Sequence, residues 1–121
     1  MAEGVIHLFG SNPGALVPTV LIPSTQVAAN NQAQIADFKV TASLTSSNSV
    51  FQMQRSTDNF VANNVEMDRI ELPVGGTFLV TYSSGLKILG GQWIRVIFTQ
   101  TVAGTVSATL HGGTSNGDIQ T

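Results

Sequence analysis

Apolar and polar residues alternate along most of the chain from residue 35 onward, and this alternation predicts short β-strands. In the segment 37–44 the apolar positions share one face, which consists of Phe38, Val40, Ala42 and Leu44. Such a strand buries one face in a core and leaves the other in water. Spacing at three and four residues, the sign of an amphipathic helix, is nearly absent, so the expected fold class is all-β.

The same alternation predicts further strands at 51–55, 77–82 and 105–111. Turn-forming Ser, Asn, Asp and Gly residues separate these segments at intervals of about 8–12 residues, a spacing typical of an antiparallel β-sandwich or jelly roll. We therefore expect about seven to nine strands in such a fold.

Two segments depart from simple alternation. In residues 65–72 the apolar positions change parity near Arg69, which predicts a β-bulge or two short strands. Residues 92–101 are almost continuously apolar around Trp93, which predicts a central strand covered on both faces.

The first 34 residues have a different character. Residues 5–9 are apolar, but Gly and Pro residues follow them, and the apolar segment 16–23 contains Pro18 and Pro23. Proline lacks the amide hydrogen that a sheet needs, so it confines a segment to a sheet edge or to an extended arm. We expect residues 1–34 to form an N-terminal arm or edge segment.

The remaining chain divides by composition into two parts. Residues 35–112 carry the alternating segments and form the expected β-sandwich core, while residues 113–121 are small and polar. We expect this last segment to be a frayed C-terminal tail.

The most unusual property of the composition is its low fraction of charged residues. Seven acidic and five basic residues among 121 give a charged fraction of only 10%, against about 25% in an average soluble domain. Ser, Thr, Asn and Gln supply about a third of the chain, so the surface is polar without being ionic. Close approach of another subunit to such a surface meets little electrostatic penalty.

Several classes of protein are excluded by these numbers. The basic residues stand singly, and the net charge is −2, so neither nucleic-acid binding nor attachment to a membrane surface is expected. Cysteine is absent, which excludes disulfides and cysteine-based zinc sites. No apolar stretch is long enough to span a bilayer, and we expect no secretory signal in the opening residues.

The residues that could carry chemistry do not form a recognisable catalytic set. His7 and His111 lie far apart in the sequence, without a second ligand at metal-binding spacing. Glu66, Asp68 and Glu71 alternate with apolar residues, as on one solvated strand face rather than in a calcium loop. A nucleophile elbow and a phosphate-binding loop are both missing, so we expect no enzyme, no metal site and no cofactor.

Aromatic residues leave a binding role open. Trp93 and Tyr82 could form a platform for sugars, although a single Trp in the most apolar strand is more typical of a core. Arg95 shares strand parity with Trp93, and the two would anchor an interface if that face were exposed, because both residue types are enriched at binding hot spots.

Three segments, 51–58, 91–96 and 104–110, resemble in style the small β-sandwich proteins of tailed-phage particles, in particular capsid decoration (cement) proteins. The resemblance covers residues 35–112 as a pattern. It implies a structural virion protein, made in the host cytoplasm, that sits on the capsid surface as a homotrimer and bridges subunits of the major capsid protein. It identifies no catalytic residue.

The expected interface combines the N-terminal arm with the Trp93 face. Its residues are Val5, Ile6, Leu8, Phe9, Leu16, Val17, Val20, Leu21, Ile22, Trp93 and Arg95. The alternative is a carbohydrate- or receptor-binding sandwich of a fibre or tail component.

Overall fold

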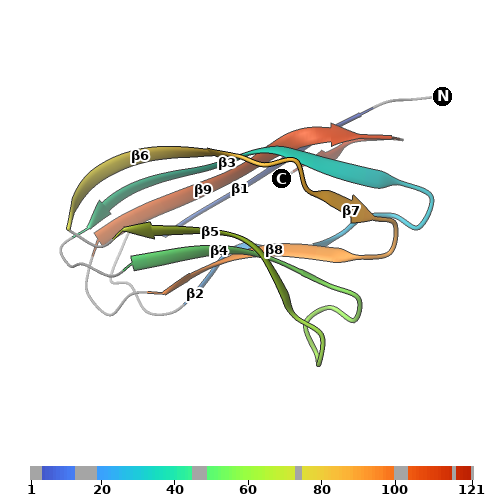
Figure 1. The fold of residues 1–121 in the computed structure, drawn as a ribbon, viewed down its shortest axis with the longest axis horizontal. Coiled ribbons are helices and arrows are strands. Elements are labelled where there is room, and N and C mark those ends of the chain that lie inside the picture. Colours follow the sequence, from blue (N-terminus) through green and yellow to red (C-terminus); the bar gives the residue numbers. More distant parts are fainter. Residues whose placement is uncertain are drawn as a thin grey trace.

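The computed structural model describes residues 4–12, 19–44, 49–72, 75–99, 104–115 and 117–120. Within these ranges the chain consists of β-strands, turns and bends without a helix, and the strands form two sheets that pack face to face (Figure 1). The all-β, sandwich-like fold expected from the alternation is therefore confirmed. Neither a jelly-roll topology nor an extended N-terminal arm is confirmed.

The larger sheet, sheet A, contains six strands in the order β10-β1-β9-β3-β6, and β7 pairs with β3 next to β6. Its strands are β1 (Gly4–Asn12), β3 (Gln32–Leu44), β6 (Gly76–Ser83), β7 (Lys87–Leu89), β9 (Gly104–Thr114) and β10 (Ile119–Gln120). The short β10 runs parallel to β1, whereas the other pairs in this sheet are antiparallel.

The smaller sheet, sheet B, contains four antiparallel strands in the order β2-β8-β4-β5. Its strands are β2 (Thr19–Gln26), β4 (Ser49–Ser56), β5 (Val65–Leu72) and β8 (Trp93–Thr99). Sheet B lies below sheet A in Figure 1, and β5 and β6 lie toward the viewer.

The core fills the space between the sheets, and strand alternation selects its members. Buried and exposed residues alternate along β3, as the sequence predicts, and Phe38 at its centre is fully buried. Phe51 of β4 and Phe98 of β8 pack in sheet B with ring centroids 4.6 Å apart. Each such side chain contributes about 1.5–3 kcal/mol of transfer free energy to folding.

The described parts of the N-terminal segment are sheet strands rather than an arm. β1 pairs with β9 from Gly4 to Asn12, and its alternation directs Ile6 and Leu8 into the core, where both are fully buried. β2 pairs with β8 at the edge of sheet B, with register shifts in the stretch that contains Pro23. The proline therefore has the edge position expected of it, but the segment completes the sandwich.

Part of the expected C-terminal tail also belongs to sheet A. β9 extends to Thr114, and Ile119 and Gln120 pair with Ile6 and His7 of β1. The amide of Val5 donates a 2.9 Å hydrogen bond to the carboxylate of Asp118. These contacts hold residues 117–120 on the sheet, although their sequence shows no strand periodicity.

The expected irregularity in β5 occurs two residues before the predicted position. The β4–β5 register shifts between Met53 and Gln54, whose partners are Asp68 and Glu66, so that Met67 is the extra residue. A bulge of this kind changes the parity of the side chains that follow it, and Ile70 accordingly points into the core.

Candidate interaction surfaces

The central strand of sheet B has one buried and one partly exposed face. Ile94, Val96 and Phe98 of β8 are fully buried. The alternating residues Trp93 and Arg95 are only half-buried on the outer face. The expectation that both faces of this strand are covered is met on the inner face and only in part on the outer one.

A loop between β4 and β5, residues 57–64, partly covers this outer face. The guanidinium carbon of Arg95 lies 3.9 Å from the ring centroid of Phe60, within the range of a cation–π contact. Arg95 Nε also donates a 2.9 Å hydrogen bond to Oε1 of the buried Gln54. Burial lowers the pKa of Arg95 from its ordinary value, but the guanidinium stays charged at neutral pH.

The shape of this loop, residues 57–64, follows from Ser56 and Asp58. The buried Ser56 hydroxyl donates to the Asp58 carboxylate and accepts hydrogen bonds from the amides of Asp58 and Phe60. The carboxylate accepts three further backbone amides, those of Val61, Ala62 and Asn63. The Ser56 hydroxyl is the main cause, with these amides, of a lowered pKa of Asp58.

These hydrogen bonds hold the loop as a defined projection below sheet B (Figure 1). Asn59 and Phe60 adopt left-handed backbone angles, with φ of 57° and 63°, which few non-glycine residues adopt. The turn places Phe60 over Arg95 and leaves the next residue, Val61, 85% exposed.

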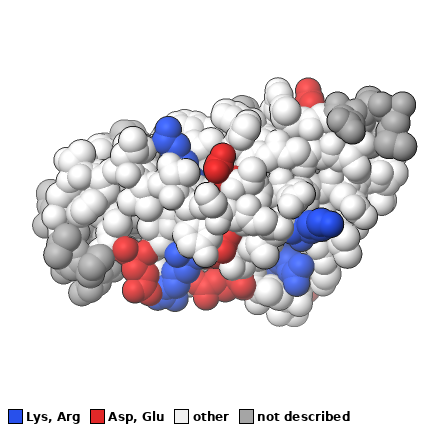
Figure 2. Space-filling view, turned by 45° about the horizontal axis from the view of Figure 1, so that its top comes forward, with Lys and Arg blue, Asp and Glu red and all other residues white. Residues whose placement is uncertain are grey.

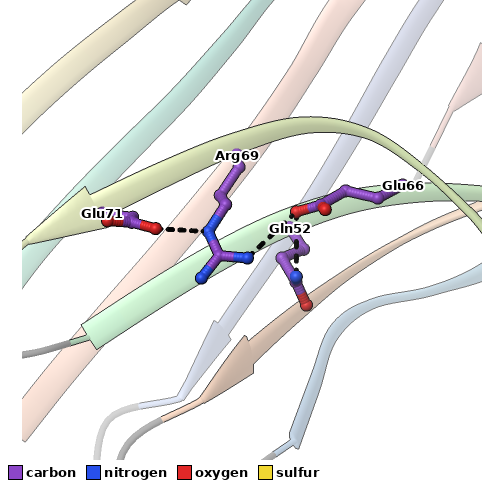
Figure 3. Close-up of polar contacts among 4 residues, drawn as sticks. All are labelled: Gln52, Glu66, Arg69 and Glu71. Carbon is purple, nitrogen blue, oxygen red and sulfur yellow. Dashed lines mark hydrogen bonds and ion pairs between the residues drawn. The ribbon is translucent and has the colours of Figure 1, made fainter.

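A charged network covers the outer side of β5 (Figure 3). Arg69 Nε lies 2.6 Å from Glu71 Oε1, and its Nη1 lies 3.6 Å from Glu66 Oε1, which also accepts a hydrogen bond from Gln52. The expected solvated face is thus correct for Glu66 and Glu71. Asp68 differs, because the bulge gives it the inward parity of Ile70, and its Oδ2 is buried without a hydrogen-bond partner among the described residues.

The outer face of sheet A carries few charges. The charged residues in its strands are Asp37, Lys39 and Lys87. Most of this surface is uncharged (Figure 2). It includes exposed apolar residues on β1 and β6, namely Val5 at 41%, Phe9 at 48% and Leu79 at 66% exposure. This neutral outer face is a candidate interaction surface.

The two histidines, which lie far apart in the sequence, are neighbours on the outer face of sheet A. His7 and His111 are direct partners in the β1–β9 ladder, with ring centroids 6.2 Å apart. His111 Nδ1 lies 4.0 Å from Asp37 Oδ2 on β3. No group of three or more metal-binding side chains occurs in the parts of the chain that the structure describes, so this cluster is a local polar site.

The predicted interface residues fall into three groups. Val5, Phe9 and Val20 are exposed, and Trp93 and Arg95 are half-buried on the outer face of sheet B. The residues that the structure buries in the core are Ile6, Leu8, Leu21 and Ile22. Leu16 and Val17 lie outside the described residues.

The two aromatic residues of the expected sugar platform lie on different sheets. Tyr82 pairs with the buried Phe38 and so lies on the inner side of sheet A, at its edge. Trp93 faces outward from sheet B. The aromatic neighbour that sequence reasoning missed is Phe60, because only the folded loop 57–64 brings it over Arg95.

Comparison with models of known protein families and with curated proteins found no match. The described segments include no helix with the length and apolarity needed to cross a membrane.

Proposed function

We propose that this protein is a structural subunit of a phage particle, which decorates the capsid and stabilises it by bridging neighbouring subunits of the shell. The resemblance of residues 51–58, 91–96 and 104–110 to capsid decoration proteins is the starting point for this proposal. The two-sheet fold is compatible with it. In this role the chain acts as an oligomer, a trimer in the simplest arrangement, in contact with the major capsid protein.

The observation that carries the proposal is the neutral outer face of sheet A. Phe9 and Leu79 expose apolar surface there, among Ser and Thr side chains on neighbouring strands. Covering apolar area gains about 25 cal/mol per Å², and a face with few ions avoids most of the desolvation cost of buried charges. Such a face favours permanent contact with other subunits over free exposure.

Immunogold electron microscopy of phage particles from the source culture tests this role. An antibody to the exposed loop 57–64 is expected to label the head surface of intact particles, because this loop projects from sheet B, opposite the proposed contact face. Particles produced without the gene serve as the control. Labelling of tails, or particles that lack the protein altogether, would contradict a decorating role.

The Phe60–Arg95–Trp93 cluster supports a second candidate, a carbohydrate- or receptor-binding module. The cluster combines a stacked guanidinium, the amide of Gln54 and a half-buried Trp on one face, and sites that bind polar ligands commonly combine such groups. Trp93 is the one Trp of the chain, so its fluorescence reports on this cluster directly. Saturable quenching by a glycan panel, lost in Phe60→Ala, would favour this candidate, and indifference to sugars would remove it.

A further inference from the structure

We propose that β6 forms a two-fold contact with β6 of a second copy of this chain, so that sheet A continues across two molecules. The contact is antiparallel and centred on Val80. It goes beyond the proposed function, and it does not depend on that function.

The far side of β6 is an edge without the usual protection. β3 pairs with one side of β6 over eight consecutive residues without a register shift, and no strand of the described ranges pairs with the other side. Natural edge strands are normally protected by charged residues, prolines or bulges. Residues 76–83, GTFLVTYS, contain neither a charge nor a proline. An edge of this kind is a template for another strand.

The side chains of β6 remain partly exposed on both sides of the sheet. Phe78 and Val80 pack against the core but are only half-buried, and Tyr82 on the same side is 44% exposed. Leu79 on the outer side is 66% exposed. An additional strand beside β6 would cover apolar surface on both faces.

The sequence of β6 is complementary to itself. In an antiparallel pair centred on Val80, Phe78 lies opposite Tyr82, and Leu79 lies opposite Thr81. Aromatic and β-branched cross-strand pairs stabilise sheets by about 0.2–1 kcal/mol each. The ends of the paired segment also match, because the small hydroxyl residues Thr77 and Ser83 lie opposite each other. No like charges meet in this arrangement.

The pleat restricts which registers are possible. A shift of one residue would place the inward side chains of the second copy on the outer face. Centring on Leu79 keeps the faces but places Tyr82 opposite Gly76, without an aromatic partner. Centring on Thr81 shortens the paired segment. Of these registers, the one centred on Val80 therefore places aromatic residues opposite each other along the full strand. Because β6 is complementary to itself in this register, we assign a second copy of the chain as the partner of this edge.

Single cysteines test the register, because the natural chain has none. Val80→Cys places two thiols directly opposite each other, with Cα atoms about 4.5–5.5 Å apart, a separation that a disulfide spans. Leu79→Cys and Thr81→Cys are the matched controls, since each faces a different residue and its own copy lies diagonally, about 7–8 Å away. Mild oxidation should therefore yield covalent dimers for Val80→Cys alone.

The mass of the unmodified protein in solution provides the independent readout. The two-fold contact predicts an even number of chains at high concentration: two if it acts alone, six if a threefold contact is present as well. Leu79→Lys should break this contact, because the two lysines then lie diagonally across the Val80 pair as like charges. An equal mixture of Leu79→Lys and Leu79→Glu should restore it, because the two charges are then opposite. Leu89→Lys, on β7 and beyond the paired segment, starts from a similar exposure of 51% and should leave the mass unchanged.

The outcomes separate this inference from the proposed function. A trimer, or a monomer at all concentrations, would overturn the β6 contact, and the trimer would leave the decorating role intact. Cross-linking at Leu79 or Thr81 in place of Val80 would overturn the register. If the protein forms even-numbered assemblies in solution but immunogold labelling finds none of it on phage heads, the β6 contact would be supported and the decorating role contradicted. Should Val80→Cys fail to fold, the charge exchange at Leu79 decides the question.

Discussion

β5 and β6 are the edge strands of the two sheets on the same side of the sandwich (Figure 1), yet they have opposite characters. β5 contains four charged residues among eight, interrupts its pairing with a bulge, and turns one of its acids, Asp68, inward. β6 contains no charge and pairs without interruption. Charges, bulges and inward-pointing ions prevent strand addition. The difference indicates that β5 is built to face water and that β6 is built to be covered.

On the opposite side of the sandwich, the two sheets are in contact with each other. There β1 and β2 contact each other, and the absence of a side chain at Gly10 allows the two sheets to approach. A Cβ atom added to Gly10 would lie only 1.7 Å from the carbonyl oxygen of Leu21. At β5 and β6, by contrast, apolar side chains such as Val80 remain half-exposed.

Gly10→Ala is expected to have the largest effect, because it removes the closure on the β1–β2 side. The new methyl group meets backbone rather than a flexible side chain, so the strands must separate. We expect the free energy of unfolding to fall by about 3 kcal/mol, measured by urea denaturation.

Gly85→Ala is the matched control for this substitution. Gly85 lies between β6 and β7, and a Cβ atom there would meet nothing within 4 Å, so its stability should change by less than about 1 kcal/mol. Equal stability losses in the two variants would show that the two sides of the sandwich do not differ in closure.

Alternation predicts which way a side chain points but not what covers it. The inward positions of Val106, Ala108 and Leu110 followed from the pattern, as did those of Phe51 and Met53. The pattern also placed Phe78, Val80 and Tyr82 on one common face, but in the structure all three remain partly exposed at the edge of sheet A. Their burial is set by how the sheets pack, which no local pattern encodes.

Strand partners were the second thing that the sequence could not supply. His7 and His111 meet because β1 pairs with β9, at a separation of more than a hundred residues. Ile119 and Gln120 form a strand only because β1 offers them a partner, since two residues have no periodicity. The choice between an N-terminal arm and an edge segment stayed open for the same reason, because the sequence of a proline-containing segment is the same whether its partner is its own sheet or another subunit.

Ser56→Ala is expected to have the next largest effect, and to act on β5 but not on β6. It leaves the partly buried amides of Asp58 and Phe60 without their acceptor, which costs about 2 kcal/mol. Amide hydrogen exchange should quicken in β5, which follows loop 57–64, and stay unchanged in β6. Equal acceleration in both strands would show that the two edges are not independent.

Acid should loosen loop 57–64 in the same way. The pKa of Asp58 in the folded protein lies below its ordinary value of 3.8, mainly because the Ser56 hydroxyl donates to the carboxylate. The carboxylate therefore contributes its full stabilisation above that ordinary value, and the contribution is lost as the pH falls through the lowered pKa. Asp58→Asn should remove this acid-dependent step from β5 exchange, and an unchanged step would assign it to another group.

Neutralising β5 is expected to have the smallest effect on stability and directly tests the contrast between the edges. Exposed ion pairs such as Arg69–Glu71 contribute less than about 1 kcal/mol, so replacing Glu66, Asp68, Arg69 and Glu71 by their amide counterparts or Gln should scarcely change the urea midpoint. The net charge also changes, from −2 to 0 by removal of three acids and one base. If charge is what keeps β5 apart from other strands, this variant should associate further than the natural chain, measured by sedimentation.

The variant with neutralised β5 and the chain with natural β5 must both carry Leu79→Lys, so that the β6 contact does not contribute to their association. In Leu79→Lys the β6 contact is absent, so any concentration-dependent association gained on neutralisation comes from the rest of the surface. Neutralising Asp37 and Lys87 instead, one acid and one base that lie outside both β5 and loop 57–64, controls for lower charge density. Association in the β5 variant alone would show that edge charge distinguishes the two strands, whereas a monomeric β5 variant would place the protection in the bulge at Met67.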